Sequence, residues 1–186
     1  MSRRFVILDR DGTINVEVGY VLDSDEMEMI PGAIEALREL RALGLGVVVT
    51  TNQSPIGRGQ LTWERLDEIH ERLRALLREG GVELDGIYAC PHAPGDGCDC
   101  RKPQPGMALR AAREHGFDLA EAFVVGDHAA DMQMGRRIGA TTILVRTGHG
   151  EEELMNGAGD HADHVVSDLR EAVRVIRDTV AGEVCR

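Results

Sequence analysis

The sequence contains few aromatic and few basic residues, and both shortages exclude classes of partner. Phe, Trp and Tyr make up only 3% of the 186 residues, too few for a surface on which nucleic-acid bases stack. Lys and Arg number 21 against 32 Asp and Glu, which gives a formal net charge of −11. An acidic chain of this kind is not expected to bind nucleic acid or an anionic membrane, and an anion would need a local basic pocket. No apolar surface stripe demands a partner, so we expect a monomer.

Long hydrophobic runs are also absent. The apolar run near the N-terminus spans only residues 5–8, too short for the core of a signal peptide, and the longest later run, residues 43–49, contains two glycines. We therefore expect a cytoplasmic protein without a membrane span. With 42% apolar residues, the chain can bury a core as one domain, residues 1–186, without disulfides.

Only four cysteines are present, and their spacing indicates a metal site. Three of them fall within eleven residues beside a histidine, in the pattern Cys90-x-His92-x5-Cys98-x-Cys100. A disulfide framework would spread its cysteines more evenly. Three thiolates and one imidazole form a closed tetrahedral set for Zn²⁺, with no open position for water. We expect a structural zinc ion at these residues and a free thiol at Cys185.

The expected zinc loop also carries two basic residues. Lys102 follows Cys100 by two positions, and residues 93–97 of the loop include one proline and two glycines. A bound metal gives such a flexible segment a defined shape. We therefore expect the zinc to fix Arg101 and Lys102 in place rather than to act in chemistry.

Short apolar runs alternate with segments of helical periodicity along the whole chain. The expected strands are residues 5–8, 47–50, 87–89, 123–125, 142–145 and 165–166. The expected helices are residues 31–44, 62–80, 105–115, 129–138 and 168–180, with residues 148–163 as a loose connection. This alternation predicts an α/β fold, a doubly wound Rossmann-like parallel sheet with helices on both faces. In such sheets ligands bind beyond the carboxyl ends of the strands.

Polar side chains follow four of these strands. The segments are Asp9-Arg10-Asp11-Gly12-Thr13, Thr50-Thr51-Asn52-Gln53-Ser54, Arg101-Lys102 after the cysteines, and Gly126-Asp127 with Asp131. Each has an ordinary explanation as a turn, a helix cap or a surface lysine. Together, at one edge of a parallel sheet, they favour a site for phosphate and Mg²⁺, because magnesium prefers oxygen ligands and lysine binds phosphoryl oxygens.

The spacing of Asp9 and Asp11 suits two different tasks. Residues i and i+2 of a strand point to the same side. One carboxylate can attack phosphorus to give an aspartyl-phosphate, while the other protonates the leaving oxygen and later activates water. Mg²⁺ offsets the repulsion between such close carboxylates, with Asp127 as a further ligand.

These segments resemble the four motifs of the haloacid dehalogenase superfamily of phosphatases, in the same order and with similar spacing. The resemblance covers about residues 5–145 and implies a nucleophile at Asp9 and a general acid/base at Asp11. It also implies phosphoryl ligands at Thr51 and Lys102 and a secondary acidic group at Asp131. The implied magnesium ligands are Asp9, the backbone carbonyl of Asp11, and Asp127. No large cap domain fits between the motifs.

Within that superfamily the zinc loop resembles two groups, the D-glycero-D-manno-heptose-1,7-bisphosphate 7-phosphatases of heptose nucleotide synthesis and the histidinol-phosphatases. Asn15, residues 19–21, residues 51–54 and residues 56–59 are more similar to the heptose group. That group implies a phosphorylated sugar as substrate and Arg101 as a further catalytic residue. The implied substrate-binding residues are Asp9, Arg10, Asp11, Glu17, Val18, Gly19, Tyr20, Thr51, Asn52, Gln53, Ser54, Arg101, Lys102 and His128. Several members of the group have lysine where this chain has His128.

Three alternatives remain at this stage. A histidinol-phosphate phosphatase would keep the chemistry and change the substrate. A receiver-like signalling domain is also acidic and phosphorylated on aspartate, but it carries its phosphoacceptor on a later strand and has no zinc loop. A zinc-stabilised binding module would keep its function after Asp9→Asn. The sequence leaves the anomer of the sugar open, and we expect His149 to be a solvated surface residue.

Overall fold

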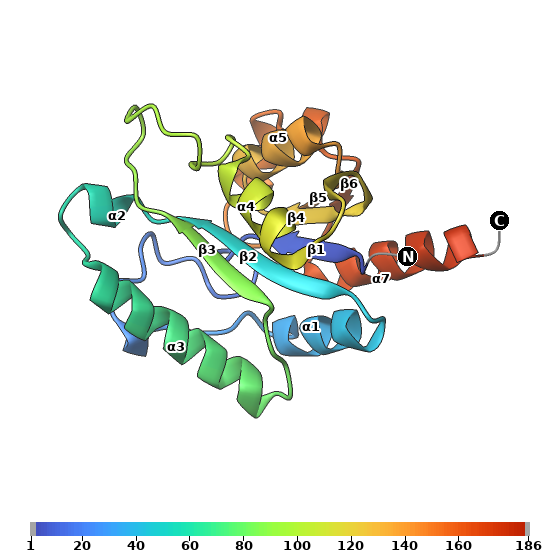
Figure 1. The fold of residues 1–186 in the computed structure, drawn as a ribbon, viewed down its shortest axis with the longest axis horizontal. Helices are drawn as coiled ribbons and strands as arrows, with labels where there is room; N and C mark the ends of the chain where they lie inside the picture. Colours follow the sequence, from blue (N-terminus) through green and yellow to red (C-terminus); the bar gives the residue numbers. More distant parts are fainter. Residues whose placement is uncertain (1–2, 185–186) are drawn as a thin grey trace.

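The computed structural model describes residues 3–184 and contains a parallel sheet of six strands in the order β3-β2-β1-β4-β5-β6 (Figure 1). The strands are β1 (Phe5–Leu8), β2 (Gly46–Asn52), β3 (Gly86–Cys90), β4 (Phe123–Gly126), β5 (Thr141–Val145) and β6 (His164–Val166). All five strand pairs are parallel. This is the strand order of the Rossmann fold, so the predicted fold class is confirmed. It differs from the 2-1-3-4-5 order of receiver-type domains.

Helices connect the strands and cover both faces of the sheet (Figure 1). They are α1 (Ala33–Ala42), α2 (Ser54–Gly57), α3 (Trp63–Glu79), α4 (Gly106–His115), α5 (Ala129–Ile138), α6 (Gly150–Met155) and α7 (Leu169–Val184). The long helices begin close to the predicted positions, and the hydroxyl of Thr62 caps α3 by accepting from the N–H of Arg65. Residues 148–163 contain α6 and a 3-10 turn rather than a loose loop. A helix of six residues is too short to display a helical period.

The buried residues of β1 divide between two cores. Val6 and Leu8 pack with apolar residues of α1, α3 and α7 on one face of the sheet. Phe5 and Ile7 pack on the other face with residues of α4 and α5. Successive side chains of a strand point to opposite faces, so a central strand covered on both sides is apolar throughout. The continuous run that predicted this strand follows from that burial.

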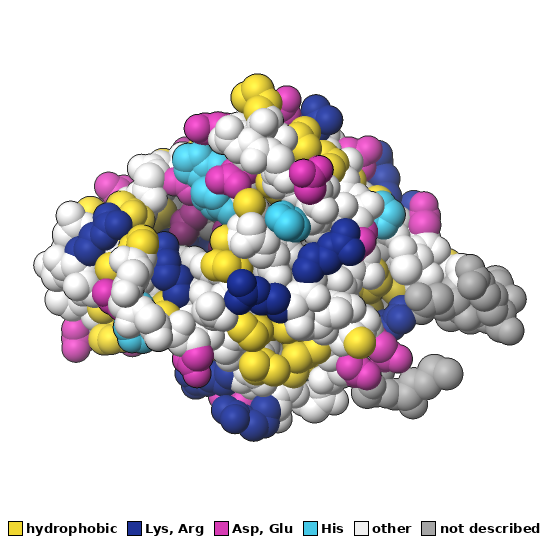
Figure 2. Space-filling model, turned by 90° about the horizontal axis from the view of Figure 1, so that it is seen from above, with side chains coloured by type: hydrophobic (Ala, Val, Ile, Leu, Met, Phe, Trp, Pro, Cys, Tyr) yellow, Lys and Arg dark blue, Asp and Glu magenta, His cyan; other side chains and the backbone are white. Residues whose placement is uncertain are grey.

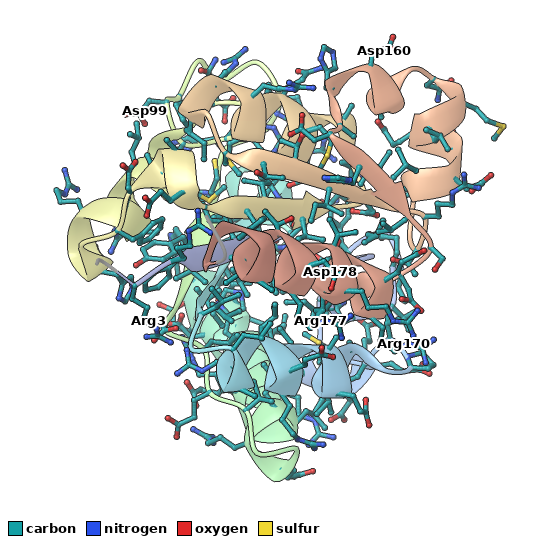
Figure 3. All side chains as sticks on the ribbon, turned by 90° about the vertical axis from the view of Figure 1, so that its right-hand side faces the viewer. Arg3, Asp99, Asp160, Arg170, Arg177 and Asp178 are labelled. Atoms are coloured by element: carbon teal, nitrogen blue, oxygen red, sulfur yellow. The ribbon has the colours of Figure 1, made fainter. Side chains whose placement is uncertain are left out.

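Helix α7 packs beside α1 on one face of the sheet. Arg177 and Asp178 project from α7, as Figure 3 shows, and Arg177 reaches Glu39 of α1 with 3.3 Å between Nη1 and Oε1. The helix continues to Val184, beyond the predicted end, and Cys185 lies outside the described residues. Within residues 3–184 there is no separate cap domain. Among these residues, no helix combines the length and apolar character needed to cross a bilayer.

Candidate active site

A pocket of about 440 Å³ lies beyond the carboxyl ends of the strands. Figure 2 shows histidine and acidic side chains beside a hollow, with basic side chains close by. The pocket is lined by Asp9, Asp11, Glu17, Gly19, Tyr20, Thr51, Asn52, Ser54, Arg101, Lys102, His128, Ala130, Asp131 and His149. The structure thus brings together most of the residues that the sequence predicted for the site. Arg10, Val18, Gln53 and Asp127 are close in sequence but do not line this pocket.

Lys102 places its charge between two carboxylates at the floor of the pocket. Its Nζ lies 2.7 Å from Oδ1 of Asp9 and 2.7 Å from Oδ1 of Asp131, and it donates to the carbonyl of Thr50 at 2.8 Å. Burial by itself lowers the pKa of this amine, but the charges of Asp131 and Asp9 outweigh burial and raise it above its usual range. Lys102 is therefore a fixed cation beside the expected nucleophile.

Asp9 is buried at the end of β1 and accepts two hydrogen bonds on one oxygen. Oδ1 faces Lys102 and also accepts from the N–H of Arg10 at 2.7 Å. Burial raises the pKa of Asp9 to about 6, repulsion from Asp131 adds to this, and Lys102 opposes it. The carboxylate is thus ionised at neutral pH and has its other oxygen available to a reacting group.

Asp127, at the start of the turn after β4, is enclosed by two glycines. A Cβ on Gly12 or on Gly148 would come within 2.1 Å or 2.2 Å of its Oδ2. Oδ2 accepts from the N–H of His149 at 2.8 Å, whereas Oδ1 is buried without a hydrogen-bond partner among residues 3–184. Burial and then repulsion from Asp9 raise the pKa of Asp127 to about 9.

The carboxylate groups of Asp9, Asp127 and Asp131 offer oxygens that all lie within 4.8 Å of one another. Asp131 already accepts from Lys102 and, at 3.3 Å, from the N–H of His128. A divalent cation fits this group, because it would satisfy the unpaired oxygen of Asp127 and neutralise the crowded charge. The side chain of Asp11 is not part of this group.

Asp11 lines the pocket and is hydrogen-bonded to Gln53, which does not line it. Nε2 of Gln53 donates to Oδ2 of Asp11 at 3.1 Å and to Oγ1 of Thr51 at 2.8 Å. Arg10 also pairs with Asp11, at 2.8 Å between Nη2 and Oδ2. The resemblance gave Arg10 and Gln53 as substrate-binding residues, but the structure points their polar groups at Asp11.

Asn52 lines the pocket, yet its amide is engaged with the backbone of Lys102. Nδ2 donates to the Lys102 carbonyl at 3.2 Å, and Oδ1 accepts from the Lys102 N–H at 3.0 Å. The end of β2 therefore holds the loop that carries Lys102.

The predicted zinc residues converge in space. Sγ of Cys100 lies 3.2 Å from Sγ of Cys90 and 3.3 Å from Nδ1 of His92, and Cys90 and Cys98 are 3.8 Å apart at sulfur. All four ligand atoms lie within 4.8 Å of one another, and the three cysteines are free thiols. This donor set fits tetrahedral zinc. Arg101 is attached to the cluster through its N–H on Cys98 and its Nη1 on the His92 carbonyl.

The pocket mouth is formed by the loop that carries Glu17 and Tyr20. The Tyr20 hydroxyl accepts from Ser54 Oγ at 3.3 Å and from Arg58 Nη1 at 3.4 Å. The guanidinium of Arg58 lies over the Tyr20 ring, 5.9 Å from its centroid. Val18 is 52% exposed and does not line the pocket.

His149, expected as a solvated surface residue, keeps 43% of its side chain exposed but also lines the pocket. It is half-buried in the pocket wall, with its ring centroid 4.9 Å from that of His128 and its Nε2 3.9 Å from Glu17. His128 in turn faces Glu153 of α6, with 3.2 Å between Nδ1 and Oε1. The segment after β5 shows no periodic pattern, so nothing in the sequence connects His149 with the site.

Comparison with known proteins agrees with this geometry. A family model described as HAD-hydrolase-like matches residues 99–172. D-glycero-beta-D-manno-heptose-1,7-bisphosphate 7-phosphatase of Yersinia pestis is 43% identical and covers 91% of this chain and 94% of its own. The enzyme of the same name from Escherichia coli K12 is 42% identical, with 91% and 93% covered.

A solved structure shares the fold. The D,D-heptose 1,7-bisphosphate phosphatase of B. bronchiseptica, complexed with magnesium and phosphate, superimposes with a TM-score of 0.88 at 36% identity, covering 95% of this chain and 99% of that chain. The predicted resemblance is confirmed. The chain belongs to the haloacid dehalogenase-like family of phosphatases, which hydrolyse phosphoric monoesters.

Proposed function

We propose that the chain removes the 7-phosphate of D-glycero-β-D-manno-heptose 1,7-bisphosphate, in a magnesium-dependent reaction that passes through an aspartyl-phosphate. The observation that carries the proposal is the contact of Lys102 with Asp9 beside the unpaired oxygen of Asp127. The substrate and its anomer are taken from the names of the relatives described above.

In the first step a carboxylate oxygen of Asp9 attacks phosphorus, and the bond between phosphorus and the sugar oxygen breaks. The leaving oxygen takes a proton from Asp11, which also lines the pocket. Lys102 and Thr51 hold the phosphoryl oxygens, since both face the same pocket as Asp9.

In the second step water attacks the phosphorus of the aspartyl-phosphate. Asp11 takes a proton from that water, Asp9 is released as a carboxylate, and inorganic phosphate leaves. The proton that Asp11 gives in the first step is thus recovered in the second, and the sum is hydrolysis of one phosphate ester.

Asp9 and Asp127, with the backbone carbonyl of Asp11, would hold Mg²⁺. When bound, Mg²⁺ neutralises the carboxylates and withdraws charge from the phosphoryl oxygens. The relative from B. bronchiseptica, which is complexed with magnesium and phosphate, supports the choice of magnesium as the ion.

The rest of the pocket would receive the sugar and its second phosphate. Arg101 and His128 line the pocket and supply positive or hydrogen-bonding groups, while Glu17 and Tyr20 offer acceptors for hydroxyls. Zinc would act structurally by fixing Arg101, which donates hydrogen bonds to Sγ of Cys98 and to the carbonyl of His92. A cytoplasmic location is part of the same proposal, since cysteines that would hold zinc rather than form disulfides suit a reducing compartment.

The test is phosphate release with Mg²⁺ from the α and β anomers of heptose 1,7-bisphosphate and from histidinol phosphate, side by side. Asp9→Asn, checked for folding by circular dichroism, is the blank. We expect the β anomer to be preferred and the product to retain its 1-phosphate. Preference for histidinol phosphate would overturn the substrate and keep the chemistry. Full activity of Asp9→Asn would overturn the mechanism.

A further inference from the structure

The carboxylate of Asp11 accepts five hydrogen bonds from three side chains. Arg10 donates to Oδ1 from Nε at 3.1 Å and from Nη2 at 3.0 Å, and to Oδ2 from Nη2 at 2.8 Å. Asn15 donates to Oδ1 at 2.9 Å, and Gln53 donates to Oδ2 at 3.1 Å. Both oxygens are therefore fixed in direction, since displacing either one breaks at least two of these bonds.

The three donors lie behind Asp11, on the side away from the pocket. Arg10 and Asn15 are 0% exposed and Gln53 is 1% exposed, and none of them lines the pocket. Asp11 does line it, with 19% of its side chain exposed. A substrate in the pocket can thus contact Asp11 directly, whereas the three donor side chains are buried and out of its reach.

Arg10 depends on Asp11 for its charge pairing. Within the described part of the chain, the polar contacts of its guanidinium all go to Asp11, and Nη1 is buried without a partner. A buried guanidinium left unpaired is strongly unfavourable, so the pair holds both side chains in one arrangement. Gln53 adds a link to Thr51, and Asn15 a link to its own loop through the Val16 carbonyl at 3.0 Å.

We propose that Arg10 and Gln53 are positioning residues for the acid/base group Asp11 and do not contact substrate. The inference rests on the proposed function, in which Asp11 protonates the leaving oxygen. It replaces the substrate-binding role that family resemblance gave to both residues. Arg10 suits the task because its planar fork matches both carboxylate oxygens, which a lysine cannot do.

The nature of the leaving group distinguishes a role in positioning Asp11 from a role in binding substrate. A sugar alkoxide needs a proton as it leaves, whereas a nitrophenolate leaves without one. A displaced Asp11 therefore slows the first step with the sugar phosphate and spares the first step with p-nitrophenyl phosphate, whereas the second step needs Asp11 with both substrates. Loss of a substrate contact instead raises KM for the sugar phosphate.

The experiment measures the first step alone, as release of the sugar or of nitrophenolate in a single turnover, for Arg10→Lys and Gln53→Leu. The substrates are heptose 1,7-bisphosphate and p-nitrophenyl phosphate, each over a range of concentrations. We expect the rate of this step with the sugar to fall about 100-fold, with the half-saturating concentration changed less than about twofold. On p-nitrophenyl phosphate the loss stays below about threefold. In an Asp11→Asn background the same substitutions cost little more, because residues that act through one group are not additive.

Three results would overturn the proposal: a higher half-saturating concentration for the sugar at an unchanged rate of the first step, an equal loss of that rate on both substrates, or full additivity with Asp11→Asn. Melting temperatures show whether each variant folds. If Arg10→Lys does not fold, the comparison is made with Gln53→Leu alone. If the wild-type enzyme does not hydrolyse heptose bisphosphate, that result contradicts the proposed substrate and leaves the positioning role untouched. The alkyl phosphate that it does hydrolyse then takes the place of the sugar in the same comparison.

Discussion

Nζ of Lys102 lies 2.7 Å from Oδ1 of Asp9, and both side chains are almost completely buried. Lys102 is also the only lysine in the sequence. An acidic chain that binds a phosphate ester needs its positive charge at the point of reaction, and here one buried amine supplies it between two carboxylates. The first prediction concerns this contact.

Lys102→Met leaves Asp9 and Asp131 facing each other without a cation. We expect kcat/KM to fall about 1,000-fold and the free energy of unfolding without Mg²⁺ to fall by about 3 kcal/mol. Activity assays and urea unfolding measure the two effects. Arg146→Met is the control, because Arg146 is exposed and its 3.4 Å pair with Glu151 lies on the surface. A Lys102→Met enzyme as stable as the control would contradict the buried pairing.

Asp127 gives the metal-free protein a distinctive dependence on pH. Its pKa is raised to about 9 in the folded state by burial and neighbouring charge. The folded protein then retains a proton that the unfolded chain loses above about pH 4, so stability falls as pH rises between those values, by at most about 1.4 kcal/mol per unit. Asp127→Asn removes this part of the slope.

Mg²⁺ provides the second arm of that experiment. Saturating Mg²⁺ holds Asp127 ionised in the folded state, so the wild-type stability curve becomes flatter above neutral pH. Urea unfolding at several pH values, with and without Mg²⁺, measures both effects. Identical curves for wild type and Asp127→Asn without metal would show that this carboxyl is not perturbed.

His70 produces a slope of the opposite sign. It is buried in α3 with Nε2 unpartnered among the described residues, and burial followed by the charge of Arg10 lowers its pKa to about 3. Below about pH 6.5 this imidazole binds a proton in the unfolded chain but not in the folded protein, so stability is lost as pH falls from 6.5 towards 3. We expect His70→Leu to lose less stability than wild type over that range. Thermal melts at pH 7 and pH 5 test it, and parallel shifts in both proteins would contradict it.

The zinc cluster links stability to substrate binding. Cys98→Ser removes one of four ligands and loosens Arg101, whose N–H donates to Cys98 Sγ at 3.3 Å. We expect lower zinc content, a lower melting temperature and reduced activity together. Cys185→Ser, far from the cluster in sequence, is the matched control for loss of a thiol. Unchanged melting and turnover in Cys98→Ser would argue against a structural zinc.

The strand segments, the cysteine and histidine cluster and the motif positions could be predicted because each depends on local sequence. Residues 5–8 are buried on both faces of the sheet and are therefore apolar without interruption. Asp9 comes directly after them, and the carboxyl end of a strand in a parallel sheet is where ligands bind, so its place at the site could be predicted. The single domain and the individual roles of the site residues stay predictions.

Side-chain direction at the strand ends could not be predicted. Arg10 lies between two pocket residues in sequence, yet it turns into the protein, and Gln53 turns behind the pocket while Ser54 lines it. These directions depend on backbone turns and on partners such as Asn15 that come from other segments. His149 reaches the pocket because α6 begins directly after it, and so short a helix leaves no periodic signal.

Gly148 offers a test of the enclosure around Asp127. Its φ is +57°, and an added Cβ would lie 2.2 Å from Oδ2 of Asp127 and 2.5 Å from Cα of Gly12. Gly148→Ala therefore combines backbone strain of about 1 kcal/mol with displacement of the carboxylate. We expect calorimetric Mg²⁺ affinity to fall at least about tenfold, since one ligand group moves.

Gly44→Ala separates the two effects, because Gly44 has φ +78° with no atom within 4 Å of an added Cβ. It should lose a similar amount of stability through backbone strain and keep the wild-type affinity for Mg²⁺. Equal Mg²⁺ affinity in the two variants would mean that Asp127 does not hold the ion. A loss confined to Gly148→Ala would instead connect the close approach of Gly12 and Gly148 to the metal site, because strain alone is common to both variants.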